Sequence, residues 1–156
     1  MFTNEEGEYM KDFNIDDSLG FIVAKTNYFM KTYFSKLIKD NGLNVTTEQW
    51  AILNAIYHNP GASQTDLARA CLKDKTNVTR ILDLLVKKGY VVRNIDINDR
   101  RIYSITLTEQ GENALELLIE ISNNANKACI SDLNKDEYQE LVRSLRIISS
   151  SIEKLL

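Results

Sequence analysis

The sequence predicts a mainly α-helical protein with one small β-hairpin. Apolar residues recur at helical spacing through most of the 156-residue chain. Residues 90–107 differ, because they alternate like two short strands around a charged loop. A helix that leads directly into such a hairpin is typical of a winged helix-turn-helix. The long helices at both ends of the chain extend this fold class with dimerisation helices.

Composition and charge are those of a folded domain. The chain is 44% hydrophobic and 26% charged, which is ordinary for a globular protein. No apolar run reaches the roughly 18 residues that a membrane span needs, and no secretory signal is visible. Cys71 and Cys129 lack metal-ligand spacing. We therefore expect a reduced, cytoplasmic protein without a metal or cofactor.

The N-terminal part of the chain predicts an arm and then a long helix. Residues 1–15 show only weak periodicity, so we expect a flexible arm. A helix begins at Leu19, with Asp17 or Ser18 as its cap, and Asn41-Gly42 ends it. Its wide aromatic stripe favours core packing and leaves a ligand pocket open as an alternative. The stripe consists of Leu19, Ile22, Val23, Thr26, Phe29, Met30, Tyr33, Phe34, Leu37 and Ile38.

Two shorter helices follow. Thr46-Thr47-Glu48-Gln49 has capping-box spacing, and the helix that it starts ends at His58-Asn59-Pro60-Gly61, because proline cannot continue a helix. We assign His58, the one histidine, to this helix end rather than to catalysis. Ser63-Gln64-Thr65-Asp66 starts a third helix. Its inward residues are Leu67, Ala68 and Cys71.

Residues 74–89 predict the helix that completes the helix-turn-helix. Asp74 is a suitable N-cap, and Gly89 ends the helix because glycine adopts the left-handed conformation at little cost. One face is apolar and consists of Val78, Ile81, Leu82 and Leu85. The two strands of the hairpin are Tyr90–Arg93 and Ile102–Leu107, and the second places Tyr103, Ile105 and Leu107 on one face.

The last two helices predict a dimerisation region. Thr108 caps a helix that continues to about Ile130, with Leu115, Leu118, Ile119, Ser122 and Ala125 directed inward. Asn134-Lys135-Asp136-Glu137 starts the last helix, whose near-heptad stripe has no later segment to cover it. We therefore expect residues 16–44 and 109–156 to form a two-fold dimer interface and residues 46–107 to form a separate lobe.

The charge distribution indicates a nucleic-acid partner. The whole chain has a net charge of −3, but residues 73–101 hold eight basic and four acidic residues. That segment is therefore +4 and the remainder is −7. A basic patch on an acidic body is typical of a DNA-binding module. The acidic body should limit non-specific binding to DNA.

This interpretation assigns specific side chains to contacts with DNA. We expect Thr76, Asn77 and Arg80 near base edges, with Lys75 and Thr79 near phosphates. Arg101 is assigned to the minor groove with Asp99 holding its guanidinium, and Arg100 to a phosphate. Helix N-termini bind phosphates, so Ser63, Gln64 and Thr65 are further candidates. The alternative for the helix residues is a solvated helix face. The alternative for the wing residues is a solvated hairpin tip.

These residues resemble the MarR family of bacterial transcriptional regulators from about Leu19 to Leu156. The wing is the most specific part: Asp96-Ile97-Asn98-Asp99-Arg100-Arg101, then Leu107-Thr108 with Gly111 three residues after the threonine. Ile97 stands where the family commonly has proline. The run from Thr79 to Tyr90 is similar to the recognition helix of the family, and the two preceding helix starts also match.

The resemblance implies an obligate homodimer that acts as a repressor, or less often an activator, on a pseudo-palindromic site. In many members a small phenolic or lipophilic molecule binds between the dimerisation helices and the DNA lobe. The candidates here are Tyr33, Phe34, Trp50 and Leu118, which are equally consistent with a filled core.

Three other function classes fit the sequence less well. A winged-helix module that binds protein instead of DNA would not need the clustered arginines. Some relatives sense oxidants through a cysteine in the first helix. This chain has none there, which leaves Cys129 for a redox role. An enzyme is disfavoured, because the sequence has no phosphate-binding glycine loop, no metal spacing and no nucleophile–histidine–acid set.

Overall fold

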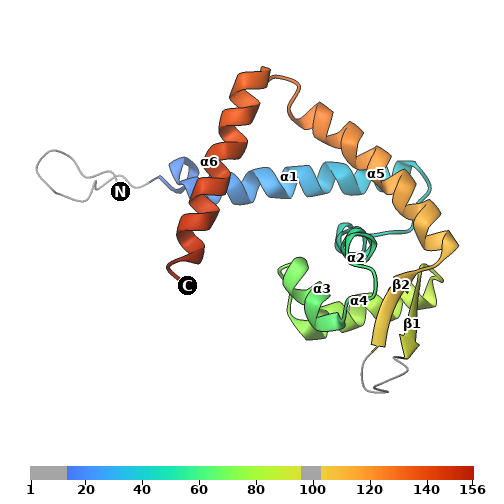
Figure 1. The fold of residues 1–156 in the computed structure, drawn as a ribbon. Helices are drawn as coiled ribbons and strands as arrows, with labels where there is room; N and C mark the ends of the chain where they lie inside the picture. Colours follow the sequence, from blue (N-terminus) through green and yellow to red (C-terminus); the bar gives the residue numbers. More distant parts are fainter. Residues whose placement is uncertain (1–13, 96–102) are drawn as a thin grey trace, which may run out of the picture.

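The computed structural model describes residues 14–95 and 103–156. The elements run in the predicted order, and Figure 1 shows a compact lobe carried between long helices. In chain order they are η1 (Ile15–Asp17), α1 (Leu19–Asp40), α2 (Thr47–His58), α3 (Gln64–Ala70), α4 (Lys75–Lys87), β1 (Val91–Ile95), β2 (Tyr103–Leu107), α5 (Glu109–Cys129) and α6 (Lys135–Glu153). The described part contains no helix that is both long enough and apolar enough to span a bilayer.

The helices begin at the capping residues that the sequence predicts. Ser18 Oγ accepts from the Phe21 N–H at the start of α1. The reciprocal capping box of Thr46 and Gln49 starts α2. Asp74 Oδ1 accepts from the Asn77 N–H at 2.7 Å, and Gly89 takes a left-handed φ of 74° just after α4. Local side-chain chemistry therefore defines these helix boundaries.

One hydrophobic core joins α2, α3, α4, the hairpin, the inward face of α5 and the C-terminal part of α1. The four apolar residues predicted for α4 are all buried, which confirms the predicted face. The largest fully buried side chains are Ile38, Ile52, Leu53, Ile56, Leu67, Leu82, Leu85, Ile105, Leu115 and Leu118. Because α4 buries this face against α2 and α3, its polar face is turned to the outside of the lobe.

The hairpin is antiparallel, and its register runs from Val91 opposite Leu107 to Ile95 opposite Tyr103. The first strand begins one residue later than predicted. The Tyr90 carbonyl instead accepts from the Thr108 N–H at the start of α5. The hairpin is therefore fixed at its base, where α4 ends and α5 begins. The N-terminal arm, apart from residues 14 and 15, and the wing loop lie outside the described residues.

One predicted core residue of α5 is wrong. Ile119 is 36% exposed, whereas Ile121 is 5% exposed and packs in the core. The inward face of α5 passes through Ala114, Leu118 and Ile121. At 3.6 residues per turn these three positions lie on the same side of the helix, whereas Ile119 lies about a quarter of a turn or more away from them. The prediction placed Ile119 inward because it lies four residues after Leu115. That spacing carries Ile119 off the buried face.

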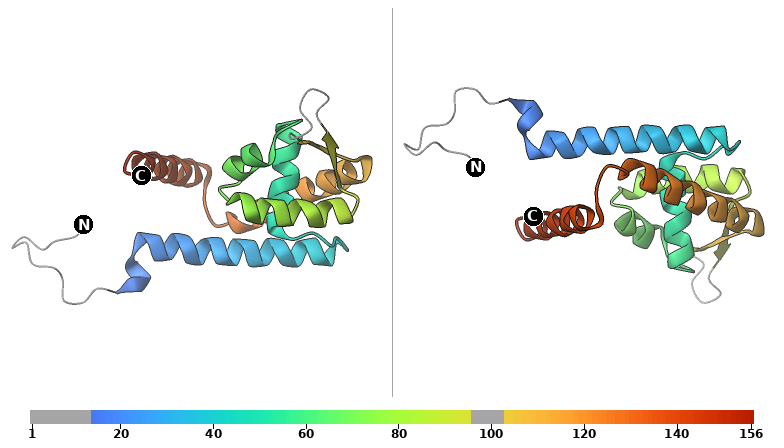
Figure 2. Two further views of the ribbon diagram at one scale, coloured as in Figure 1. Left: turned by 90° about the horizontal axis from the view of Figure 1, so that it is seen from below. Right: turned by 90° about the horizontal axis from the view of Figure 1, so that it is seen from above.

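The long helices α1 and α6 leave apolar faces uncovered in a single chain. Only Phe34 and Ile38 of α1 are buried, and α6 buries no residue. In Figures 1 and 2, α6 stands away from the lobe in every view. The exposed apolar residues of the two helices are Leu19, Ile22, Val23, Tyr28, Phe29, Met30, Tyr33, Tyr138, Leu141, Leu145, Ile147 and Ile152. Such faces usually pack against another helix.

Candidate functional site

The outer face of α4 presents polar and basic side chains. Lys75, Thr76 and Arg80 are exposed, while Asn77 and Thr79 are half-buried. Arg80 Nη2 donates to Asn77 Oδ1 at 3.2 Å. Two of the side chains assigned to base contacts are thus already paired in the free protein. This pairing limits their rotamers and presents a guanidinium and an amide side by side.

The first turn of α3 lies against α4. Gln64 Oε1 lies 3.1 Å from the hydroxyl of Thr79. Ser63 caps α3, and both its amide and its hydroxyl donate to the Asp66 carboxylate, at 3.1 and 2.6 Å. The Ser63 hydroxyl and amide therefore serve the helix cap in the free protein. The structure brings Ser63 and Gln64 beside the recognition face, and Thr65 is exposed.

The wing residues Asp99, Arg100 and Arg101 lie outside the described residues, so their contacts stay a prediction. The strands that lead to them are described. Arg93 on β1 forms an ion pair with Asp83 on α4, with 2.7 Å between Nη1 and Oδ1. This pair could not be predicted from the sequence, since no periodicity links a helix residue to a strand residue across a glycine turn.

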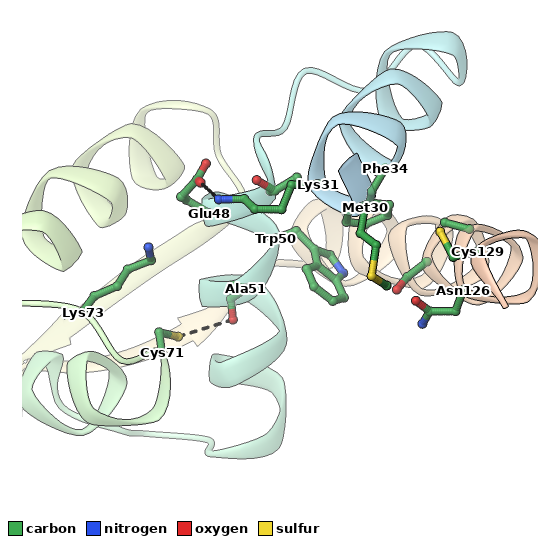
Figure 3. Close-up of a pocket in the computed structure, with 13 residues that line it drawn as sticks. Met30, Lys31, Phe34, Glu48, Trp50, Ala51, Cys71, Lys73, Asn126 and Cys129 are labelled. Atoms are coloured by element: carbon green, nitrogen blue, oxygen red, sulfur yellow. Dashed lines mark hydrogen bonds and ion pairs between the residues drawn. The ribbon is translucent and has the colours of Figure 1, made fainter. Parts of the chain in front are cut away.

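A cavity of about 340 Å³ lies between α1, α2, α5 and the turn before α4. Its size is within the range of small-molecule sites. In Figure 3, Trp50 and Met30 extend into the space between α2, α1 and α5, and Lys73 lies on the side of the α4 turn. The lining residues are Met30, Lys31, Phe34, Thr47, Glu48, Trp50, Ala51, Cys71, Lys73, Ser122, Ala125, Asn126 and Cys129.

One wall of the cavity is apolar and another is charged. The Phe34 and Trp50 rings meet edge to face at 5.0 Å, and the buried Trp50 Nε1 finds no acceptor among the described residues. Lys31 Nζ lies 2.6 Å from Glu48 Oε1 and joins α1 to α2. Lys73 lines the same cavity, so the charged lining residues sum to one positive charge.

The Glu48 carboxylate of this pair is ionised at neutral pH. The hydrogen bond from Lys31 lowers the pKa of Glu48 from 4.5 to about 2. Stabilisation from a carboxylate with a lowered pKa is present above 4.5 and is lost as the pH falls toward 2. Both side chains are more than one third exposed, so solvent screening keeps this contribution below about 1 kcal/mol.

The four side chains expected in an effector pocket fall in different places. Phe34 and Trp50 line the cavity. Tyr33 lines a neighbouring hollow of about 380 Å³ that shares Met30 and Cys129 with it. Leu118 is fully buried in the core. The sequence carried no signal for Lys31, Glu48 or Lys73, because residues from four separate segments meet only in the fold.

The two cysteines have different environments. The Cys71 thiol donates to the Ala51 carbonyl at 3.6 Å, and burial raises the pKa of this thiol. A protonated thiol is a weak nucleophile. Cys129 is exposed at the end of α5. His58 is the last residue of α2, at the predicted helix end, and its ring meets that of Tyr57 edge to face.

Comparison with known proteins decides the family. A family model described as MarR family matches residues 42–102. The HTH-type transcriptional regulator SarZ of Staphylococcus haemolyticus is 30% identical over 143 residues, which cover 92% of this chain and 95% of that protein. The chain belongs to the MarR family of transcriptional regulators. Members of the MarR family bind DNA and act as dimers.

Solved MarR-family structures share the fold. BpsR of Bordetella bronchiseptica, in a structure on the regulation of its DNA binding by 6-hydroxynicotinic acid, has a TM-score of 0.80 at 22% identity. The match covers 88% of this chain and 97% of BpsR. A mutant of MarR from E. coli, complexed with operator DNA, has a TM-score of 0.79 at 24% identity. That match covers 87% of this chain and 96% of the E. coli protein.

Proposed function

We propose that this MarR-family protein is a homodimeric repressor that binds a pseudo-palindromic operator and is released by a small ligand. The outer face of α4 carries the proposal, because it combines exposed Lys75, Thr76 and Arg80 with the paired amide of Asn77. Arginine and asparagine are the side chains that most often read guanine and adenine in the major groove. Regulation by this route involves no catalysis, and it takes place in the cytoplasm, where bacterial DNA lies.

Three segments of the lobe have separate roles in this proposal. Thr76, Asn77 and Arg80 contact bases, while Lys75, Thr79 and the first turn of α3 contact phosphates. Arg101 enters the minor groove with Asp99 supporting it, and Arg100 contacts a phosphate. Residues 16–44 and 109–156 hold two lobes roughly 34–36 Å apart, which is one turn of the duplex.

Replacing Arg101 with alanine tests the DNA-binding part. We expect the affinity for DNA from the protein's own promoter to fall about ten- to a hundredfold at moderate salt. The affinity of the unmodified protein should also fall steeply as salt rises, because phosphate contacts release counterions. Fluorescence anisotropy with labelled duplexes measures both effects.

The matched control is Lys39→Ala, which removes the same charge from the last turn of α1, outside the lobe. This control should bind the promoter normally. Unchanged binding by Arg101→Ala would remove the minor-groove role. Binding that does not depend on salt, or no binding to the promoter, would favour a winged-helix module that binds protein.

The cavity supports a small aromatic anion as the ligand. Its apolar wall, with Met30, Phe34 and Trp50, suits a flat ring, and its charged wall has an excess of one positive charge. BpsR, whose DNA binding is regulated by 6-hydroxynicotinic acid, shares the fold. Because the cavity reaches Lys73, next to the N-cap of α4, an occupant there would bear on the position of the recognition helix.

A panel of hydroxylated aromatic acids and their neutral amides tests the ligand. We expect the acids to raise the Tm and release promoter DNA, and the amides to do so at least tenfold less effectively, since one charge-assisted contact is worth about 1.5–3 kcal/mol. Lys73→Gln should remove the preference for the acid. Lys39→Gln, which removes a charge at the far end of α1, should keep it. Equal responses to acid and amide would contradict the anion assignment.

A further inference from the structure

The ion pair between Asp83 and Arg93 joins the recognition helix to the wing. Asp83 lies in the second half of α4, and Arg93 is the central residue of β1. Arg93 Nη1 lies 2.7 Å from Asp83 Oδ1. The turn at Gly89 separates the two elements, so this contact spans the angle that they enclose.

The direction of Arg93 follows from its place in the strand. Successive side chains of a strand alternate between its two faces, so Arg93 shares a face with Val91, which is 1% exposed. Val92, on the other face, is 41% exposed. Opposite Arg93 in the register is Ile105, which is fully buried. A guanidinium thus occupies an inward position where the hairpin would otherwise carry an apolar residue.

This arrangement has a cost that a role in stability does not explain. Arg93 Nε and Nη2 are buried and find no acceptor among the described residues. A buried donor without an acceptor lowers stability, because it loses its hydrogen bonds to water and gains none in the protein. The Asp83 side chain is 57% exposed, so its ion pair offsets only part of that cost. An apolar residue at position 93 would pack without leaving unsatisfied donors. It would not, however, fix the orientation of β1 against α4.

We propose that Arg93 and Asp83 are positioning residues that set the angle of the wing against the recognition helix. The guanidinium is planar and donates in fixed directions, which suits it to hold a strand at one orientation. Operator specificity then depends on the pair, because α4 and the wing must reach their grooves together. This inference rests on the proposed function, in which Arg101 binds the minor groove.

A double-mutant cycle of Asp83→Asn with Arg101→Ala tests the inference. The readout is the ratio of the affinity for promoter DNA to the affinity for scrambled DNA. We expect Asp83→Asn to lower this ratio about tenfold, and to have little further effect once Arg101 is absent, because contacting networks are not additive. Asp83→Glu, which keeps the carboxylate, should restore most of the ratio.

A general effect of charge and a loss of folding would each change the two affinities in a different way. Asp132→Asn removes the same charge from the exposed turn after α5 and should leave the ratio unchanged. If charge alone acted, Asp83→Asn would raise both affinities alike. Loss of folding would lower both, and circular dichroism would detect it. Full additivity of the two substitutions would overturn the inference, whereas an unaffected Arg101→Ala variant would overturn the proposed wing contact itself.

Discussion

Replacing Gly111 with alanine should cost about 3 kcal/mol or more of folding free energy, the upper end for a side chain forced into a filled space. A Cβ at this position would lie 2.0 Å from the Tyr90 carbonyl oxygen and 2.9 Å from its carbon. Both are backbone atoms, so no rotamer change relieves the clash. The first turn of α5 would have to move away from the base of the wing.

The damage should extend beyond one contact, because Gly111 lies within a hydrogen-bonded junction. The Thr108 hydroxyl donates to the Gly89 carbonyl at 2.6 Å and accepts from the Gly111 N–H at 3.0 Å. The Thr108 N–H donates to the Tyr90 carbonyl at 3.1 Å. These bonds join the end of α4, the start of β1 and the start of α5, so displacing Gly111 disturbs all three elements.

Thermal unfolding at a fixed protein concentration measures the effect, since dimers unfold in a concentration-dependent way. We expect Gly111→Ala to lower the Tm by about 10 °C. Gly20→Ala is the matched control, because a Cβ there meets nothing within 4 Å. In the exposed α1 helix that change should be neutral or stabilising by up to about 1 kcal/mol. Equal Tm values for the two variants would refute the steric argument.

Replacing Leu145 with glutamate should dissociate the dimer and reduce promoter affinity about a hundredfold or more, because two linked lobes bind far more tightly than one. Leu145 lies near the middle of the apolar stripe of α6 and is 38% exposed in a single chain. In the single chain, α6 contains no buried residue. The dimer of a MarR-family regulator would bury this stripe, and a carboxylate in it would be desolvated without a partner.

Light scattering reports the mass, and anisotropy reports the affinity. Ser150→Glu places the same charge on the opposite side of α6 and should leave both unchanged, since residues five apart lie about 140° apart around a helix. A Leu145→Glu variant that stays dimeric would show that this face of α6 is not in the interface. If Leu145→Glu stays dimeric but binds the promoter weakly, the substitution has altered the spacing of the two lobes.

Capping residues and periodic apolar stripes were enough to predict most of the fold. Ser18, Thr46, Ser63, Asp74, Thr108 and Asn134 each cap the helix that follows them. These signals act over three or four residues, so they can be read from the sequence directly. Ile119 was misplaced because its neighbours Leu115 and Leu118 allow two slightly different faces, and only packing selects between them.

Parts of the candidate site were predictable for the same reason, and others were not. The polar face of α4 follows from a single helical pattern. The cavity does not, because Met30, Trp50, Lys73 and Asn126 come from segments far apart in the sequence. The ion pairs of Lys31 with Glu48 and of Asp83 with Arg93 also join separate elements. No local rule specifies which of several charged residues will meet.

The sequence by itself determined the order of the helices, the positions of their ends and the basic character of the lobe, since each depends on interactions between near neighbours in the chain. The tertiary structure decided where the wing is anchored and what lines the cavity. Gly111 illustrates the difference. The sequence marks it as part of a motif, but its physical reason, the close approach of α5 to the Tyr90 carbonyl, exists only after distant segments have packed.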